Sequence, residues 1–220
     1  MSFPTLLVAA HLPGVDAGRR TVEAVLAALR RERPALTVRL TPLDARGLRL
    51  LDAVRKTDVV VPLRLALEQH VREEVQAVRR LGARPGRHLG PDDRLIAVAS
   101  ARLDQAGALP TDDVVLVCNG GRDSVASEDV EAAARKLAKL RHTRVTTATV
   151  ATVQDVVEDR RRRGRIAVSN WLVAEGRFTP QVAGCRADAI AAPLGLSDAL
   201  VRVVLDRYDE AVNQHVQHAA

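Results

Sequence analysis

The stretch Thr5-Leu-Leu-Val-Ala-Ala-His11 decides the fold, because it recurs as Asp113-Val-Val-Leu-Val-Cys-Asn119. Each is a short apolar run of the kind that forms a strand buried on both faces. Two further pairs of blocks recur in the same order: Val59–His70 with Ile166–Arg177, and Leu89–Val98 with Leu194–Val203. The paired blocks lie 108, 107 and 105 positions apart. A near-constant separation over three blocks indicates two homologous halves.

Within each half, short β-branched runs alternate with longer helical patterns. The first half is predicted to hold strands at 6–9, 37–40, 58–62 and 87–89, and helices at 16–33, 47–54, 71–81 and 91–107. The second half is predicted to hold strands at 113–118, 144–149, 165–169 and 188–190, with helices between them. Such alternation is typical of parallel sheets covered by helices on both faces. We therefore predict an α/β chain of two tandem flavodoxin-like domains, residues 1–109 and 110–220, each with a four-stranded parallel sheet.

The composition excludes several classes of protein. Hydrophobic residues make up 47% and charged residues 27%, which is enough for a packed core and too apolar for global disorder. No apolar run reaches the roughly 18 residues of a membrane span, and the first residues lack the basic region of a signal peptide. Two cysteines, Cys118 and Cys185, are too few for a disulfide framework and lack metal-motif spacing. These features predict a cytoplasmic protein with two buried thiols and no membrane partner.

The positive charge is almost entirely arginine. The chain has 33 Lys and Arg against 27 Asp and Glu, a net charge of +6. The run Arg160–Arg163 ends a predicted helix, where solvated basic residues are common. Aromatic residues are only 2% of the chain, so stacking partners for bases are scarce and no nucleic-acid partner is expected. The Gly-rich turn Asn119–Ser124 could hold an anion, although it lacks the Lys-Ser/Thr ending of a phosphate-binding loop.

Two histidines fall where such folds bind ligands. Open parallel sheets bind ligands at the carboxyl ends of their strands, at the point where the strand order reverses. In a flavodoxin-like order that point lies between the first and third strands. His11 follows the first predicted strand, and His70 falls in the loop after the third. No other pair of the six histidines has this property. His88, on the predicted fourth strand, could be core or surface. Two imidazoles are too few for a structural zinc site, and they suit a site whose open positions a substrate completes.

The chain also resembles a known family. Its motifs include Leu7–His11, the run Val61-Pro-Leu followed after four residues by Glu68-Gln-His-Val-Arg-Glu-Glu74, and Leu89–Leu95. The second half adds Leu172–Arg177, Ala192–Gly195 and Leu205–Glu210. Together these resemble the sirohydrochlorin cobaltochelatase/ferrochelatase family, the class II tetrapyrrole chelatases in their long two-domain bacterial form, over essentially the whole length. The resemblance implies ATP-independent insertion of Co²⁺ or Fe²⁺ (Ni²⁺ in relatives) into sirohydrochlorin or a related tetrapyrrole, for cobalamin or sirohaem biosynthesis.

The resemblance implies roles for particular residues. His11 and His70 correspond to the metal-binding and catalytic histidines of the family. Glu74 occupies a position that is usually acidic there and could orient His70. Arg72 is our candidate for a contact with a substrate carboxylate, because arginine suits bidentate pairing. The metal is a substrate, so no permanently bound cofactor is expected. The duplication supplies two domains in one chain, which makes a monomer plausible.

Two departures from the family leave an alternative open. The family motif continues after its first histidine with Gly-Ser/Thr-Arg-Asp, whereas this chain has Leu12-Pro13-Gly-Val-Asp16. The second half keeps Gly-Gly-Arg-Asp at 120–123 but has Asn119 and Arg177 where histidines would stand. At most the first half is therefore catalytic. The alternative is a non-catalytic protein that binds or delivers a metal or tetrapyrrole. A third hypothesis is a scaffold whose site no longer works and which is kept for binding a partner.

Overall fold

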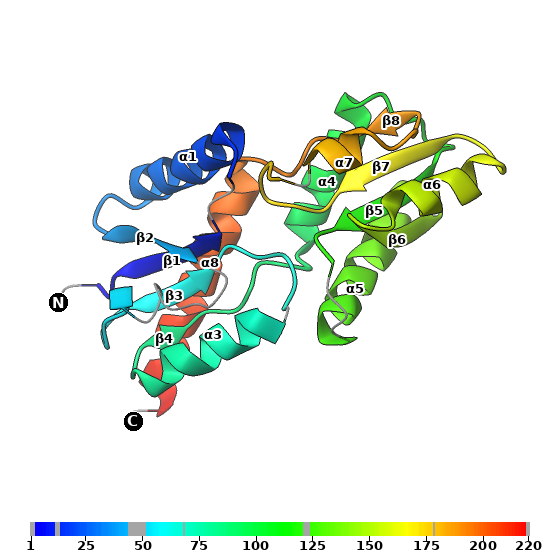
Figure 1. Cartoon of the computed structure of the whole chain (residues 1–220). Helices are drawn as coiled ribbons and strands as arrows, with labels where there is room; N and C mark the ends of the chain where they lie inside the picture. The colour runs from blue at the N-terminus through cyan, green and yellow to red at the C-terminus, as the bar shows by residue number, and fades with distance from the viewer. Residues whose placement is uncertain are drawn as a thin grey trace.

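Two four-stranded parallel sheets organise the molecule (Figure 1). This computed structural model describes residues 3–11, 14–43, 52–67, 69–120, 124–177 and 179–218. The first sheet contains β1 (Leu6–His11), β2 (Val38–Leu43), β3 (Val59–Pro62) and β4 (Arg84–Pro85), in the order β2-β1-β3-β4. The second contains β5 (Asp113–Cys118), β6 (Val145–Thr149), β7 (Ile166–Asn170) and β8 (Ala189–Ile190), in the order β6-β5-β7-β8. The same order occurs twice, which confirms the predicted α/β fold of two tandem flavodoxin-like units.

Helices cover both faces of each sheet. They are α1 (Asp16–Glu32), α3 (Gln69–Arg80), α4 (Asp93–Gln105), α5 (Ser124–Arg141), α6 (Val153–Arg161), α7 (Thr179–Ala183) and α8 (Asp198–His218). The predicted helix at 47–54 falls largely on residues 44–51, which lie outside the described residues. Within the described ranges, no helix combines the length and apolar character needed to cross a membrane.

The fourth strand of the first sheet lies earlier than predicted. The sequence pattern placed it at 87–89, but β4 is Arg84–Pro85, which pairs with Val59 and Val60 of β3. Leu89 is fully buried, yet its backbone N–H donates to the carbonyl of Arg64, beyond the end of β3. The prediction was wrong because a buried leucine was read as a strand residue. In the structure it belongs to the segment that leaves the sheet toward α4.

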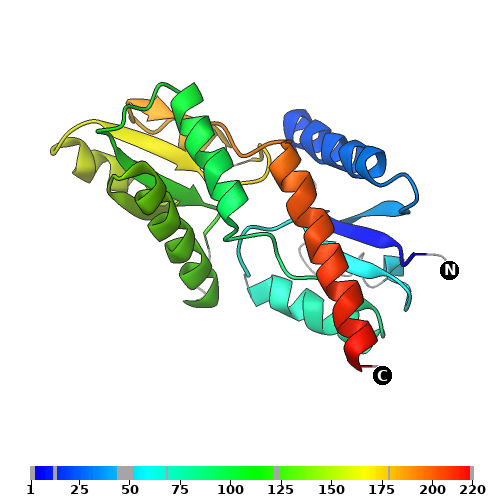
Figure 2. The same cartoon turned by 180° about the vertical axis from the view of Figure 1, so that it is seen from behind.

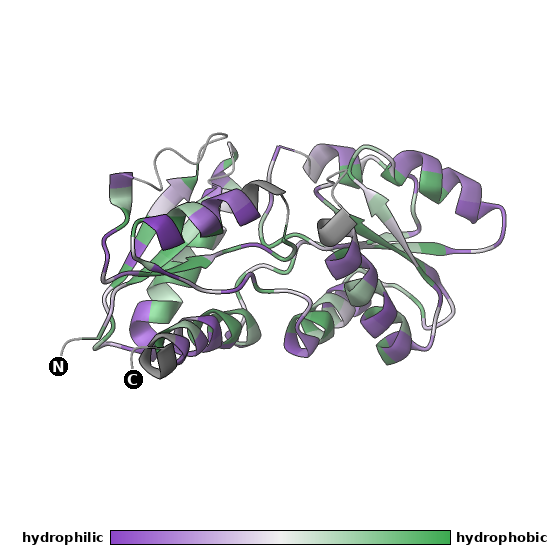
Figure 3. Cartoon of the chain, turned by 90° about the horizontal axis from the view of Figure 1, so that it is seen from below, coloured by the Kyte–Doolittle hydropathy of each residue, from purple (hydrophilic) through white to green (hydrophobic). Residues whose placement is uncertain are grey.

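The central strands are apolar because both of their faces are covered. Leu6 and Val8 of β1 point into a large core that also contains Val114 and Leu116 of β5. Leu7 and Ala9 of β1 point to the other face, and there they pack in one cluster with Val78 of α3. Figure 3 shows the apolar strands running through each half between helices whose outer faces are hydrophilic. A strand buried on both faces has no polar positions, which explains the continuous apolar runs.

The two halves exchange their last helices. Although α4 belongs to the first half of the sequence, it packs against α5 and β7 of the second. The last helix, α8, crosses back and packs against β3, β4 and α1 of the first half, and it also contacts α4 (Figure 2). The hydroxyl of Tyr208 on α8 donates to the carbonyl of Pro4, 2.7 Å away, before β1. A boundary at 109/110 thus separates the strands of the two sheets but not the helices that cover them.

Two arginines at equivalent positions of the two halves bind each exchanged helix to the half that it covers. Arg207 on α8 donates to the carbonyls of His88 and Leu89, at 3.2 and 3.5 Å. Arg102 on α4 donates to the carbonyl of Leu194, at 3.2 and 3.0 Å from its Nε and Nη2. Arg102 and Arg207 are 105 positions apart, as are Leu89 and Leu194. Each half therefore supplies the arginine that binds the Leu-Gly turn of the other.

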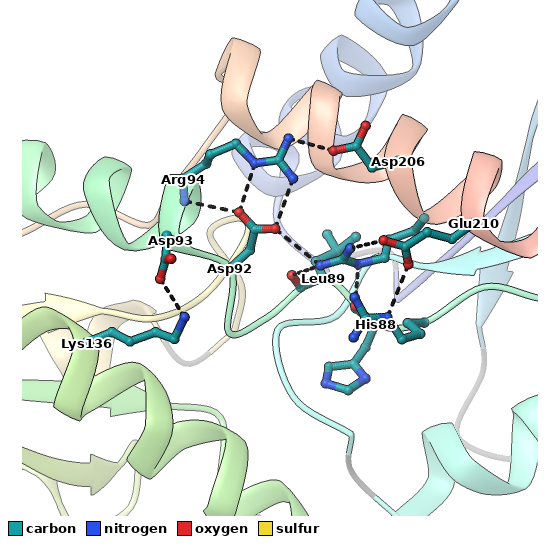
Figure 4. A network of polar contacts seen from close by, with 10 residues as sticks. His88, Leu89, Asp92, Asp93, Arg94, Lys136, Asp206 and Glu210 are labelled. Atoms are coloured by element: carbon teal, nitrogen blue, oxygen red, sulfur yellow. Dashed lines mark hydrogen bonds and ion pairs between the residues drawn. The ribbon is translucent and has the colours of Figure 1, made fainter.

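A carboxylate joins this contact to the start of α4 (Figure 4). Asp92 is the N-cap of α4 and accepts from the backbone N–H of Arg94 at 3.1 Å. Its Oδ2 lies 3.2 Å from Nη2 of Arg207, and the Arg94 side chain binds both Asp92 and Asp206 of α8. Burial alone raises the pKa of the Asp92 carboxyl. The hydrogen bonds from Arg94 and the charge of Arg207 outweigh that effect, so this pKa lies below its ordinary value.

Replacing Asp92 with Asn should destabilise the fold in a pH-dependent way. The charge is more favourable in the folded state than in the unfolded chain, so its contribution is present above about pH 4 and lost as pH falls through the lower, folded pKa. We expect Asp92→Asn to lower the free energy of unfolding by about 2 kcal/mol at pH 7, with a smaller difference at pH 3. Urea titrations at both pH values measure it.

Asp93→Asn is the matched control. The neighbouring carboxylate is 83% exposed and pairs with Lys136 on the surface. A surface pair of this kind contributes about 0–1 kcal/mol. Equal losses for the two variants at pH 7 would contradict the role given to Asp92.

Gly90 is required by a close backbone approach. A Cβ at position 90 would lie 2.4 Å from the carbonyl oxygen of Leu65 and 3.3 Å from Cζ2 of the buried Trp171. Gly90→Ala should therefore lower the free energy of unfolding by about 1–3 kcal/mol, because backbone must move to admit the methyl group. Gly14→Ala, whose Cβ would meet nothing within 4 Å, is the control. Thermal unfolding of the pair measures the effect, and indistinguishable midpoints would refute it.

Candidate functional site

His11 ends β1 at the carboxyl edge of the first sheet. Its half-buried ring places Nδ1 3.0 Å from the carbonyl oxygen of Leu43, the residue that faces it across the β1–β2 ladder. A carbonyl can only accept, so Nδ1 carries the hydrogen and Nε2 carries the lone pair of the neutral ring. Histidines that bind metals commonly donate their other ring nitrogen to a carbonyl in this way.

The strand alternation sets the face on which His11 lies. Side chains two apart on a strand share a face, so His11 lies on the same side of β1 as Leu7 and Ala9. That side is the one covered by α3, whose Val78 packs with these two residues. His11 is thus at the end of the sheet face that α3 covers.

His70 belongs to a helix rather than a loop. The sequence pattern placed it in the loop after the third strand, but α3 begins at Gln69, so position 70 is in its first turn. This correction arises because the loop after β3 is shorter than predicted. Positions 70, 74 and 78 form a stripe at i, i+4 and i+8, and Val78 of this stripe is buried against the sheet. The side chain of His70 lies outside the described residues, and its pairing with His11 stays a prediction.

Glu74 and Arg72 lie on different faces of α3 relative to position 70. Both are half-buried on α3 and both take part in polar contacts. Glu74 lies one turn after position 70 on the same stripe. Arg72 is two residues away, about 200° around the helix. The structure therefore brings Glu74 onto the His70 face and does not bring Arg72 there.

In the second half a cavity lies beside Asn119, the residue that corresponds to His11. It measures about 180 Å³ and lies at the carboxyl ends of β5 and β6. Its lining comprises Ala66 of the first half together with Cys118, Asn119, Gly120, Ser127, Val130, Glu131, Thr147, Ala148, Thr149 and Thr152. Thr147 donates to Glu131 at 2.6 Å, and the hydroxyls of Thr149 and Thr152 are 3.1 Å apart. Of the residues that the structure describes in this lining, Glu131 is the one with a charged side chain.

The two residues that replace the histidines are both at the surface. Asn119 follows β5 and is exposed, and Arg177 lies in an exposed turn before α7. Leu12 and Pro13, the departure after His11, lie outside the described residues. Among the side chains that the structure describes, no three of His, Cys, Asp or Glu gather into a group that could hold a metal ion.

A polar contact between the halves was not predicted from the sequence. His88 Nε2 lies 3.0 Å from Oδ2 of Asp129 on α5, and the same oxygen accepts from the backbone N–H of Leu67 at 2.8 Å. Burial raises the pKa of Asp129, but the close contact with His88 and the hydrogen bond from the Leu67 N–H outweigh it and hold this pKa below its ordinary value. The sequence signal was weak, because Asp129 is an acidic residue in a polar stretch of a predicted helix. Only the packing of α5 against the first half reveals its partners.

Comparison with known proteins identifies the fold. No protein-family model matches the sequence, and no curated protein matches it. SirB from Bacillus subtilis, solved with Fe³⁺, superposes with a TM-score of 0.73 at 18% identity, covering 97% of each chain. CbiX, described as the terminal enzyme for biosynthesis of siroheme in denitrifying bacteria, gives a TM-score of 0.67 at 22% identity, covering 94% of this chain and 99% of that one.

The chain has the fold of SirB and CbiX. A multi-domain protein of Deinococcus radiodurans, described as structurally similar to chelatases, shares it with a TM-score of 0.60 at 19% identity. The present chain spans 55% of that longer protein. The chelatase resemblance read from the motifs is thus matched by the arrangement of both sheets and nearly all of the chain.

The two cysteines should differ in reactivity. Cys118 is half-buried and lines the second-half cavity, whereas Cys185 is 3% exposed and burial raises the pKa of its thiol. Because the thiolate is the reactive form, iodoacetamide at pH 8 should alkylate Cys118 at least about tenfold faster than Cys185 in the folded protein. Peptide mass spectrometry follows both sites. Cys118→Ser protein should react slowly until it is unfolded, and fast labelling of Cys185 in that variant would contradict the assignment.

Proposed function

We propose that this protein is a metal chelatase that inserts a divalent metal ion, Co²⁺ or Fe²⁺, into sirohydrochlorin or a related tetrapyrrole without ATP. The observation that carries the proposal is the orientation of His11. Its Nδ1 is committed to the Leu43 carbonyl, so its Nε2 is the ligating atom, and it lies on the sheet face covered by the helix that carries His70. The shared fold with SirB and CbiX supports the same reading.

The chemistry needs a weak metal ligand that is also a base. Insertion brings one cation to the macrocycle and removes two protons from pyrrole nitrogens. A neutral imidazole binds borderline divalent metals and accepts a proton near pH 7. His11 and His70 would hold the incoming ion with most of its positions open, so that the pyrrole nitrogens can replace other ligands. Glu74, on the face of position 70, would orient that imidazole through a hydrogen bond.

The charge of the protein favours an anionic macrocycle. Sirohydrochlorin carries several carboxylates, and a net charge of +6 raises its rate of encounter with the protein. Arg72 is half-buried on α3, on a different side from position 70, so it would meet the periphery of the substrate rather than the metal. A guanidinium suits a peripheral carboxylate through paired hydrogen bonds.

The first test is an anaerobic insertion assay. Sirohydrochlorin is mixed with Co²⁺ or Fe²⁺, and the absorbance change is followed with and without protein. We expect the wild type to accelerate insertion, and His11→Ala and His70→Ala each to lower that acceleration about a hundredfold or more, because each removes a ligand and a base. The metal that gives the larger acceleration is the preferred substrate.

His142→Ala is the matched control. This histidine is exposed and follows α5 in the second half, so its loss should leave the rate unchanged. Wild-type protein that binds metal or macrocycle but leaves the uncatalysed rate unchanged would refute the chelatase proposal. That outcome would establish a binding or delivery protein on the same fold.

A further inference from the structure

The segment between β3 and α3 sets where His70 lies. It is tied at three places along its length. The N–H of Leu63 donates to the carbonyl of Ala9 in β1 at 2.8 Å, and the carbonyl of Arg64 accepts from Leu89 at 2.7 Å. The N–H of Leu67 donates to the carboxylate of Asp129 at 2.8 Å. Of these three ties, the one to Asp129 is nearest to α3, which begins two residues later.

The tie to Asp129 comes from the other half of the molecule. Asp129 lies on α5, in the half whose own histidines are replaced. His88 Nε2, 3.0 Å from the same oxygen, holds the carboxylate from a second segment of the first half. The two side chains are 20% and 15% exposed, so water competes weakly for this contact. A backbone N–H that is bonded to a carboxylate is held more firmly than one bonded to a neutral acceptor.

The contact has a geometric consequence for the proposed metal site. His11 is fixed by the β1–β2 ladder and by its own bond to Leu43. His70 lies in the first turn of α3, so its place depends on where that turn starts. Two ligands hold one ion only if their separation is fixed within a fraction of an ångström. A loosened Leu67 would let the start of α3 move relative to His11.

We propose that Asp129, oriented by His88, is a positioning residue for His70, so that the half without histidines completes the metal site of the other half. This inference rests on the proposed function of His11 and His70. It gives the second half a task in the same reaction: it does not bind the metal, but it fixes one of the residues that do.

The experiment compares three variants of the full chain. Asp129→Ala removes the acceptor of Leu67 and the partner of His88. Asp129→Asn keeps an acceptor oxygen for Leu67 and loses the charge. Lys136→Met is the control, because Lys136 lies two turns later on α5 and pairs with Asp93 of the first half, away from the β3–α3 segment.

Each protein is titrated with Co²⁺ alone, and its ligand-field absorption reports imidazole coordination. We expect Asp129→Ala to weaken Co²⁺ binding about tenfold, as loss of a group that orients a ligand commonly does, with Asp129→Asn in between and Lys136→Met unchanged. Amide hydrogen exchange of peptides covering residues 64–72 should rise in Asp129→Ala and not in Lys136→Met. Unfolding midpoints of the three variants identify any general loss of stability.

The outcomes separate this inference from the proposed function. If wild-type protein binds Co²⁺ and His70→Ala does not, the site exists. An unchanged Co²⁺ affinity in Asp129→Ala would then overturn the positioning role and leave the proposed function standing, even if exchange rises. If wild-type protein binds no Co²⁺ through these histidines, the proposed site fails and the positioning role fails with it. Faster exchange in Asp129→Ala would then mark a structural tie alone.

Discussion

The contact between Arg207 and the turn before α4 is the constraint on which the rest of the structure depends. Arg207 is buried, so its charge must be met within the protein. Asp92 and Glu210 supply the counter-charges, and the carbonyls of His88 and Leu89 accept two further hydrogen bonds from it. The same Asp92 starts α4. One buried network therefore fixes where the chain leaves the first sheet and where the last helix returns to it.

The exchange of helices joins the two halves through one apolar core. If each half kept its own last helix, the two sheets would have separate cores. Instead one apolar core runs from β1 and β3, past α8 and α4, to β5. The carboxyl edges of the two sheets are therefore held in a fixed relation, which is why a first-half residue, Ala66, can form part of the wall of a second-half cavity.

The two halves have kept the same fold and taken different parts. In the first, a histidine ends the central strand and its ring is oriented by the neighbouring strand. In the second, Asn119 follows that strand, and the space beside it is a cavity with a mixed apolar and polar lining. Asp129 of the second half accepts a hydrogen bond from the backbone of the first half, at the N–H of Leu67. The two halves therefore share one strand order but carry different side chains where the central strand ends.

The sequence alone determined the duplication, the strand order and the residues that end each central strand. Strands buried on both faces are continuous apolar runs, so the repeats could be aligned and the sheets predicted, and His11 followed from its position after the first run. Contacts between residues far apart in the chain leave no such periodic pattern. The exchange of α4 and α8, the start of α3 at Gln69 and the contact of Asp129 with Leu67 and His88 were therefore decided by tertiary packing. These contacts depend on how the two halves pack together, and no local spacing in the sequence predicts that packing.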